Sequence, residues 1–463
     1  MRNRAISITL LKGLIAVLVV GCSVSIDAQS RKDRDRAKAL EQQADKAYTA
    51  KNYREAADKY GEAIVLVPTN PNAYYRKGFA HFNLKENQQA VEALNMALMQ
   101  GYKPLEIYRL RHYIYFQEKN FDAAMADLDK ALVLAPTDIS FLTARGEILM
   151  ERKDYRAALD AFQRVLTVAP NNADTHYNIA RIHFANGDAA AQAAAAQAAL
   201  SRGTRFPGDA FFLLGDANQK MKNWAQAIDA YQKSLRVKPD LYQTYKNLAN
   251  VFTAENRITD AINALKDGLK AFPTDGGFYT ELSWLYSLAD RPDDAVQAAK
   301  AGIAILPGNS VAYTNLCRAY NETKSYELAI GACNTALRLK PGDGETHFYL
   351  GRALNLTGKS VEATRQYRLA VTGLEDRTAK NSSAADGWYL LGNAYFADNQ
   401  RDKAIEAYLK GLELSPKFTK ARYNLGIIYT LKKNKPAASS QYDLLLSLDP
   451  KLAASLKAEI DKI

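Results

Sequence analysis

The sequence predicts an all-α solenoid built from helix-turn-helix units of about 34 residues. Prolines recur at that interval, and small residues recur at fixed distances before them. A fixed period of this length is typical of stacked supersecondary units and not of a single globular core. The prolines that define the period are Pro239, Pro273, Pro307 and Pro341, together with Pro136 and Pro170, and Pro416 and Pro450.

Two small residues in each unit predict an antiparallel pair of helices in close contact. One stands twelve residues before the proline position, and the other, often glycine, stands twelve residues earlier still. Small side chains at these offsets let two helix backbones approach each other closely. The first set is Ala56, Ala90, Ala124, Ala158, Ala227, Ala261, Ala295, Ala329, Ala363, Ala404 and Ala438, and the glycines are Gly78, Gly146, Gly215, Gly351, Gly392 and Gly426.

Short polar segments separate the two helices of each unit. Asn120–Asp122 and Asn399–Asp402 are examples, and they supply turn and helix-capping residues. Proline then closes the second helix, because it cannot occupy a helix interior without breaking it.

Residues 386–416 resemble the tetratricopeptide repeat. The family's Trp, Leu-Gly, Tyr, Ala, Tyr and Pro positions fall on Trp388, Leu391–Gly392, Tyr395, Ala404, Tyr408 and Pro416. The resemblance implies a right-handed α-solenoid superhelix of about twelve helix-turn-helix repeats between Ala37 and Leu452.

The proline phasing and the composition predict six consecutive parts. The insertion near 375–384 could lengthen a helix or displace a loop, and of the two we expect an inert loop. We expect the alanine-rich helix at 189–200 to bury little area against its neighbours. The parts are a secretory signal at 1–28, a tether at 29–36, repeats 1–5 at 37–206, repeats 6–10 at 207–384, repeats 11–12 at 385–452, and a C-terminal capping helix at 453–463.

Residues 1–28 have the layout of a secretory signal, in which two arginines precede the apolar run Ile6–Val20. The run is too short to predict a membrane-spanning helix. Val19–Cys22 resembles a lipoprotein box, in which Cys22 would be lipidated, whereas Ile26–Ala28 would suit ordinary cleavage. Either route predicts an exported bacterial protein, in the periplasm or as an outer-membrane lipoprotein.

The charge of the chain favours anionic partners without naming one. The formal net charge is +11, and residues 1–28 contribute +2, which leaves +9 on the rest. This excess suits acidic peptides, lipid head groups or glycan phosphates, although an ordinary soluble surface explains it equally well. Basic runs with interleaved aromatic residues are absent from the sequence, so no nucleic-acid partner is expected.

The sequence offers little catalytic or metal chemistry. His176 and His183 lie seven residues apart, but no recognised ligand set completes them. Cys317 and Cys333 are expected to be two buried thiols, since their helical offset can separate the Cα atoms beyond about 7 Å. A disulfide between them is the alternative. We expect no cofactor and no metal site.

The resemblance to tetratricopeptide repeats implies a concave groove lined by the first helices. Arginine, tyrosine and asparagine at the inward offsets would suit an extended peptide, although these residues could equally solvate the helix faces. The predicted groove residues are Tyr75, Arg76, Arg109, Tyr113, Tyr177, Asn178, Arg181, Lys246, Asn250, Asn315, Arg318, Arg352, Tyr389 and Asn393.

Some relatives bind a peptide C-terminus with a carboxylate clamp. Lys246 and Asn250 match its first two positions, but Glu281 and Val311 stand where an amide and a lysine are needed. The clamp is therefore not expected in this chain.

These observations predict a non-catalytic scaffold that binds peptide segments of protein partners, with acidic segments favoured, in an envelope-associated assembly. The alternative is a receptor for anionic glycan or lipid ligands. An enzyme that carries such repeats is disfavoured, because no stretch remains for a catalytic domain. Membrane attachment is expected only through a lipid at Cys22.

Overall fold

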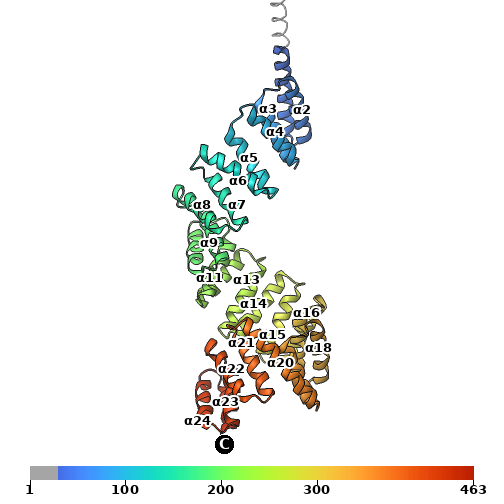
Figure 1. Cartoon of the computed structure of the whole chain (residues 1–463), viewed down its shortest axis with the longest axis vertical. Coiled ribbons are helices and arrows are strands. Elements are labelled where there is room, and N and C mark those ends of the chain that lie inside the picture. The colour runs from blue at the N-terminus through green and yellow to red at the C-terminus, as the bar shows by residue number, and fades with distance from the viewer. Residues whose placement is uncertain (1–29) are drawn as a thin grey trace, which may run out of the picture. The chain divides into compact units, whose positions relative to one another are not determined.

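The computed structural model describes residues 30–463, and this part of the chain is all-α, as predicted. Helices follow one another in antiparallel pairs, and consecutive helices lie side by side within each compact unit (Figure 1). The secretory signal and Cys22 lie outside the described residues.

Twelve helix pairs and a final helix make up the described residues. The first helices of the pairs are residues 30–49, α3 (Pro71–Asn83), α5 (Pro104–Gln117), α7 (Ile139–Glu151), α9 (Ala173–Asn186), α11 (Pro207–Lys220), α13 (Tyr242–Ala254), α15 (Gly276–Leu288), α17 (Ser310–Glu322), α19 (Gly344–Leu356), α21 (Ala385–Ala397) and α23 (Thr419–Leu431). The second helices are α2 (Tyr53–Leu66), α4 (Asn87–Met99), α6 (Phe121–Leu134), α8 (Tyr155–Val168), α10 (Ala189–Ser201), α12 (Trp224–Val237), α14 (Ile258–Ala271), α16 (Pro292–Ile305), α18 (Tyr326–Leu339), α20 (Ser360–Lys380), α22 (Arg401–Leu414) and α24 (Lys435–Leu446).

The chain divides into two compact units between Leu213 and Leu214, within α11. Unit 1 runs up to Leu213, and unit 2 runs from Leu214 to Ile463. The division lies in the helix that follows α10, the alanine-rich helix. In unit 1, α10 buries Gln192, whose Nε2 donates a hydrogen bond to the Leu213 carbonyl oxygen at 2.7 Å.

Left-handed residues reverse the chain between the two helices of most pairs. Ten of these residues are not glycine, and their φ angles lie between 57° and 63°. The set is Lys51, Lys85, Lys119, Lys153, Lys222, Asn256, Asp290, Lys324, Asn399 and Lys433. At the other end of a pair, proline acts through the residue before it: Ala135, which precedes Pro136, has a φ of −138° and lies outside the helix.

The predicted small residues form the closest helix contacts. All eleven alanines are at most 1% exposed. A Cβ added to Gly215 or Gly392 would lie 2.6 Å from the ring of Tyr231 or Tyr408, respectively, on the partner helix. The glycine therefore makes room for a fully buried ring on the second helix.

The insertion near 375–384 lengthens a helix, so the expected loop is wrong. α20 has 21 residues, whereas α18 and α22 have 14 each. Seven residues are about two helical turns, which lets the insertion extend the helix without changing the face that it buries. Glu375 in the extension accepts a hydrogen bond from the Tyr395 hydroxyl at 2.5 Å.

The ends of the solenoid also differ from the predicted boundaries. Residues 30–36 are helical and continuous with the first helix, in place of the expected tether. Arg34 Nε donates to the Ser30 carbonyl oxygen at 3.2 Å, which supports this first turn. At the other end, α25 (Pro450–Ile460) begins three residues earlier than expected and buries Leu456 and Ile460 against α23 and α24, which covers the last pair.

Cys317 and Cys333 form a disulfide that joins α17 to α18. Their Cα atoms lie 5.3 Å apart, so the helical offset does not separate them as expected. Both residues are fully buried.

Gly344 at the start of α19 and Gly373 in α20 let the backbones of these two helices touch. A Cβ on Gly373 would lie 2.7 Å from the Gly344 nitrogen, whereas a Cβ on Gly331 in α18 would meet no atom within 4 Å. We expect Gly373→Ala to lower the free energy of unfolding of this pair by about 1–3 kcal/mol. Gly331→Ala should raise the stability of α18 by about 0.5–1 kcal/mol.

Hydrogen exchange of the α19–α20 and α18 amides measures both effects. Equal protection of the two variants in these helices would contradict the close contact between Gly344 and Gly373.

Candidate functional site

A strip of aromatic rings crosses the first-helix side of unit 1. This side of a unit, formed by its first helices, is here called the first-helix wall. Consecutive ring centroids in the strip lie 4.3–6.2 Å apart. Five of the rings are half-buried, and Tyr113 is 46% exposed. The aromatic strip consists of Tyr48, Tyr75, Phe79, Phe82, Tyr102 and Tyr113.

The aromatic strip packs against the hydrophobic core of unit 1. Tyr75, Phe79, Phe82 and Tyr102 pack against the buried cluster that includes Leu94 and Ile107. Burial raises the pKa of Tyr75 and of Tyr102, so both phenols stay neutral at physiological pH. The strip therefore presents rigid, uncharged rings with one face on the core and the other accessible.

The groove residues predicted from the sequence include two members of this strip, Tyr75 and Tyr113, and the same inward offsets also supply Phe79. Tyr48 and Phe82 were missed, although they stand 34 residues apart at the same position of consecutive repeats. That recurrence was a usable signal. Tyr102 lies in the connection after α4, where no repeat position predicted it.

The two predicted arginines beside the strip are already paired with carboxylates. Arg76 Nη1 lies 2.6 Å from Asp45 Oδ1, and Arg109 Nη2 lies 3.1 Å from Asp138 Oδ2. Both arginine side chains are about half exposed, and pairs at such sites contribute about 0–1 kcal/mol. An incoming carboxylate can replace these partners at little cost.

Three predicted residues on α9 form a second group in unit 1. Arg181 is exposed, its guanidinium lies 5.8 Å from the Tyr177 ring centroid, and its Nη1 donates to Asn178 Oδ1 at 3.2 Å. Tyr177 is half-buried, but Asn178 is buried. Arg181 and Tyr177 therefore lie on the first-helix wall. The buried Asn178 side chain orients Arg181 through the hydrogen bond between them.

In unit 2, the lysine that matched the carboxylate clamp is neutralised within the chain. Lys246 Nζ lies 2.6 Å from Glu281 Oε1. Although burial alone would lower the pKa of Lys246, the hydrogen bond from its ammonium group to Glu281 raises it. Glu281 is one of the two residues that depart from the clamp pattern, and its carboxylate pairs with the cation that a clamp would need to be free.

Asn315 and Arg318 are buried, which contradicts their expected exposure on the wall. Asn315 Nδ2 donates to the Thr280 carbonyl oxygen on the preceding first helix at 2.9 Å. Arg318 forms an ion pair with Glu345 on the following first helix. Both side chains point along the stack toward neighbouring repeats, where those repeats cover them.

The other predicted residues of unit 2 lie at the surface or just below it. Asn250 and Arg352 are exposed, whereas Tyr389 and Asn393 are half-buried. Asn393 Oδ1 accepts hydrogen bonds from the Tyr408 hydroxyl at 2.5 Å and from Asn424 Nδ2 at 2.8 Å. Asn393 is thus committed to contacts within its own repeat and with the next one, and Arg352 is the exposed cation of this group.

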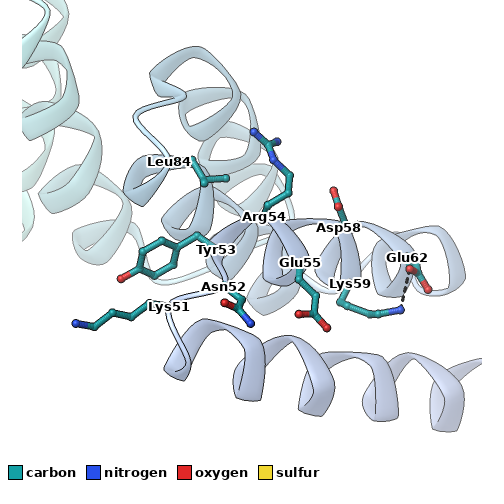
Figure 2. A pocket seen from close by; sticks show the side chains of 9 residues that line it. All are labelled: Lys51, Asn52, Tyr53, Arg54, Glu55, Asp58, Lys59, Glu62 and Leu84. Carbon is teal, nitrogen blue, oxygen red and sulfur yellow. Dashed lines mark hydrogen bonds and ion pairs between the residues drawn. The ribbon is translucent and has the colours of Figure 1, made fainter.

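A shallow hollow of ≈ 630 Å³ lies on α2 in unit 1, and Figure 2 shows its lining side chains. Three cations and three carboxylates line it; Lys59 pairs with Glu62 at 3.1 Å, and Arg54 pairs with Glu86 outside the hollow. The formal charges of the lining sum to zero, so the hollow has no excess charge to select a ligand. It is lined by Lys51, Asn52, Tyr53, Arg54, Glu55, Asp58, Lys59, Glu62 and Leu84.

Residues 30–463 contain no group of three His, Cys, Asp or Glu side chains that could hold a metal ion. Within that range, no helix combines the length and the hydropathy needed to cross a membrane.

Models of the tetratricopeptide repeat match more than half of the chain. The matched segments are residues 44–85, 113–138, 143–210, 209–240, 246–310 and 392–433. The chain belongs to the tetratricopeptide repeat family. The tetratricopeptide repeat explains the period, the buried alanines and the ring-on-glycine contacts together.

Similar proteins overlap only part of this tetratricopeptide repeat chain in sequence. The small glutamine-rich tetratricopeptide repeat-containing protein 2 of Saccharomyces cerevisiae is 36% identical over 75 residues, which are 16% of this chain and 22% of that protein. Protein ycf37 of Cyanophora paradoxa is 38% identical over 78 residues, or 17% and 45%. The chain therefore spans less than half the length of either relative. The yeast Tom70 structure overlaps 92% of this chain and 96% of its own, at 15% identity and a TM-score of 0.41.

Proposed function

We propose that this tetratricopeptide repeat protein is a non-catalytic scaffold that binds peptide segments on its first-helix walls. The aromatic strip of unit 1 carries the proposal. Rigid tyrosine and phenylalanine rings supply large contact areas with little loss of side-chain entropy, and such residues dominate binding at protein interfaces.

Charge adds a preference for acidic segments to this proposal. Arg109 lies one helical turn from Tyr113, and its pairing with Asp138 is exposed enough to be exchanged. A segment that combines an apolar side chain with a carboxylate could place the apolar side chain on the aromatic strip and the carboxylate against Arg109. Arg181 offers a further exposed guanidinium on α9.

We also propose that the scaffold is exported and works in an envelope-associated assembly. The layout of residues 1–28 supports export, and Cys22 is the candidate for a lipid anchor. Both features lie outside the described residues and stay predictions.

Selection of random displayed peptides on the full chain tests the binding proposal. We expect enriched peptides that contain apolar residues and carboxylates. Tyr113→Ser should weaken their binding at least about tenfold, because it removes the most exposed ring of the strip. Val133→Ser is the matched control, since Val133 is 79% exposed on the second helix α6.

Two results would contradict the proposal. One is enrichment of peptides that bind the Tyr113→Ser and wild-type proteins equally well. The other is a failure to enrich any peptide while vesicles with anionic lipids or anionic glycans bind, which would favour a receptor for those ligands.

A further inference from the structure

The first helix of the solenoid, residues 30–49, carries a group of cations at its N-terminal end. Counting 34 residues back from the start of α3 at Pro71 places the regular start of this helix at Ala37. Residues 30–36 therefore add about two turns that the repeat does not require. The cations, here called the basic cluster, are Arg31, Lys32, Arg34, Arg36 and Lys38.

The extra turns project past the helix on which the rest of the first helix packs. Ala37 and Leu40 form a buried cluster with Ala63, near the C-terminal end of α2. Because the two helices are antiparallel, the residues before Ala37 continue beyond that end of α2 (Figure 1). All five cations of the basic cluster are exposed there.

The basic cluster is not neutralised within the part of the chain that the structure describes. None of its five cations forms an ion pair with another of residues 30–463. The same stretch holds two carboxylates, Asp33 and Asp35, which leaves a formal charge of +3 on residues 30–38. Asp45, farther along the helix, pairs with Arg76 of the next repeat at 2.6 Å.

The helix itself opposes positive charge at this end. Its free backbone N–H groups give the N-terminus a partial positive charge, which disfavours cations in the first turns. Arg31, Lys32 and Arg34 occupy these turns, and no ion pair within the described residues compensates them. A local preference that is broken without compensation is expected where a sequence serves a function, and here it indicates an anion outside the chain.

We propose that the basic cluster binds the anionic head groups of a phospholipid membrane. Each lysine or arginine near such a surface strengthens binding about fivefold. The attraction falls off within a Debye length, about 8 Å at physiological salt. At about 1.5 Å per helical residue, the cluster from Arg31 to Lys38 is about 10 Å long, so most of it can lie within that range of the surface.

The composition of the segment favours a membrane over an acidic protein. Interfaces between proteins depend on aromatic or apolar side chains that become buried at their centre. Apart from its charged residues, the exposed positions of residues 30–39 are Ser30 and Ala39, which supply no such side chain. Attraction to charged head groups requires neither an apolar anchor nor a fixed side-chain geometry.

The place of the cluster in the chain favours the same partner. The apolar run Ile6–Val20 and the candidate lipidation site Cys22 precede it. Eight residues lead from Cys22 to Ser30, and an extended chain of that length spans about 28 Å. A lipid at Cys22 would hold the cluster close to the head groups, and the two contacts would reinforce each other. Cleavage after Ala28 would leave the cluster at the N-terminus, so the inference goes beyond the proposed function and does not require the lipid.

Binding to vesicles of defined charge tests the membrane contact. Residues 29–463 include every described helix and the packing of the first helix on α2, so this chain reports on the cluster without the apolar run and Cys22. The probe is vesicles of one-third phosphatidylglycerol and two-thirds phosphatidylcholine, compared with pure phosphatidylcholine. At low salt we expect at least about tenfold tighter binding to the anionic vesicles. This difference should disappear at about 1 M salt, where the Debye length is about 3 Å.

Paired substitutions separate the basic cluster from general charge attraction. Arg31→Gln with Arg34→Gln should weaken binding to the anionic vesicles at least about tenfold, and both positions are exposed, so the variant should fold. Lys85→Gln with Lys119→Gln removes the same charge from exposed turns between helices and should change binding less than about twofold. Arg31→Lys with Arg34→Lys keeps the charge and should bind like the wild type, whereas a site that reads guanidinium geometry would lose binding.

Three results would overturn the membrane contact: equal binding to the neutral vesicles, equal weakening by the two glutamine pairs, or weakening by the lysine pair. The peptide selection on Tyr113 reads the first-helix wall and gives a separate answer. Successful selection without vesicle binding defeats the membrane contact alone. Vesicle binding through the basic cluster without any selected peptide defeats the aromatic-strip proposal alone.

Discussion

Replacing Asp127 by alanine should lower the local free energy of unfolding of α5 and α6 by about 3–5 kcal/mol. Asp127 and Arg111 are 3% and 8% exposed, and two hydrogen bonds join them, from Nε to Oδ2 at 2.6 Å and from Nη2 to Oδ1 at 2.5 Å. Removing the carboxylate leaves a buried guanidinium with its charge uncompensated. Hydrogen exchange of the α5 and α6 amides is the suitable measurement, because repeat arrays can unfold locally.

The same helix offers a control for this substitution. Asp122 pairs with Arg152 at the start of α6, and its side chain is 91% exposed. Asp122→Ala should cost no more than about 1 kcal/mol. Combining Arg111→Met with Asp127→Leu should restore most of the loss, because apolar side chains of similar volume can replace a buried ion pair. Equal losses for Asp122→Ala and Asp127→Ala would contradict the buried pair.

The second large effect concerns the disulfide between α17 and α18. Replacing Cys317 and Cys333 together by alanine should lower the stability of this pair by about 3 kcal/mol, the value expected for a closed loop of this length. The sequence separation is 16 residues. Hydrogen exchange of α17 and α18 compared with α21 and α22 in the same variant localises the loss.

Peptide mapping without a reductant checks the bond itself. We expect the peptides that contain Cys317 and Cys333 to be recovered as one linked species from protein made in an oxidising compartment. Recovery of both residues as alkylated thiols would contradict the disulfide.

The repeat period and its small residues were enough to predict the fold, because both report local packing. A ring on one helix and a glycine on its partner, as in Tyr408 and Gly392, lie within one repeat and recur along the chain. The helical extension of α20 was missed because the sequence of an insertion of two turns is compatible with either a loop or a longer helix. Its Glu375–Tyr395 hydrogen bond becomes visible only when the next repeat is placed.

The exposure of the residues on the first-helix wall was predicted less well than the fold. Repeat offsets indicate which helix face a residue occupies, but not which neighbouring side chain covers it. Arg318 is covered through Glu345, 27 residues later, and Lys246 is neutralised by Glu281.

The central claim is that the first-helix wall of unit 1 binds peptide segments of protein partners. Photo-crosslinking in cells tests this claim most directly. A photoreactive amino acid replaces Tyr113 on the wall or Val133 on the outer second helix. We predict a few recurrent protein adducts from position 113, lost on substituting Arg109→Glu and Phe82→Ser, and none of them from position 133. The same adducts from both positions, or adducts only to lipid or glycan, would contradict the account.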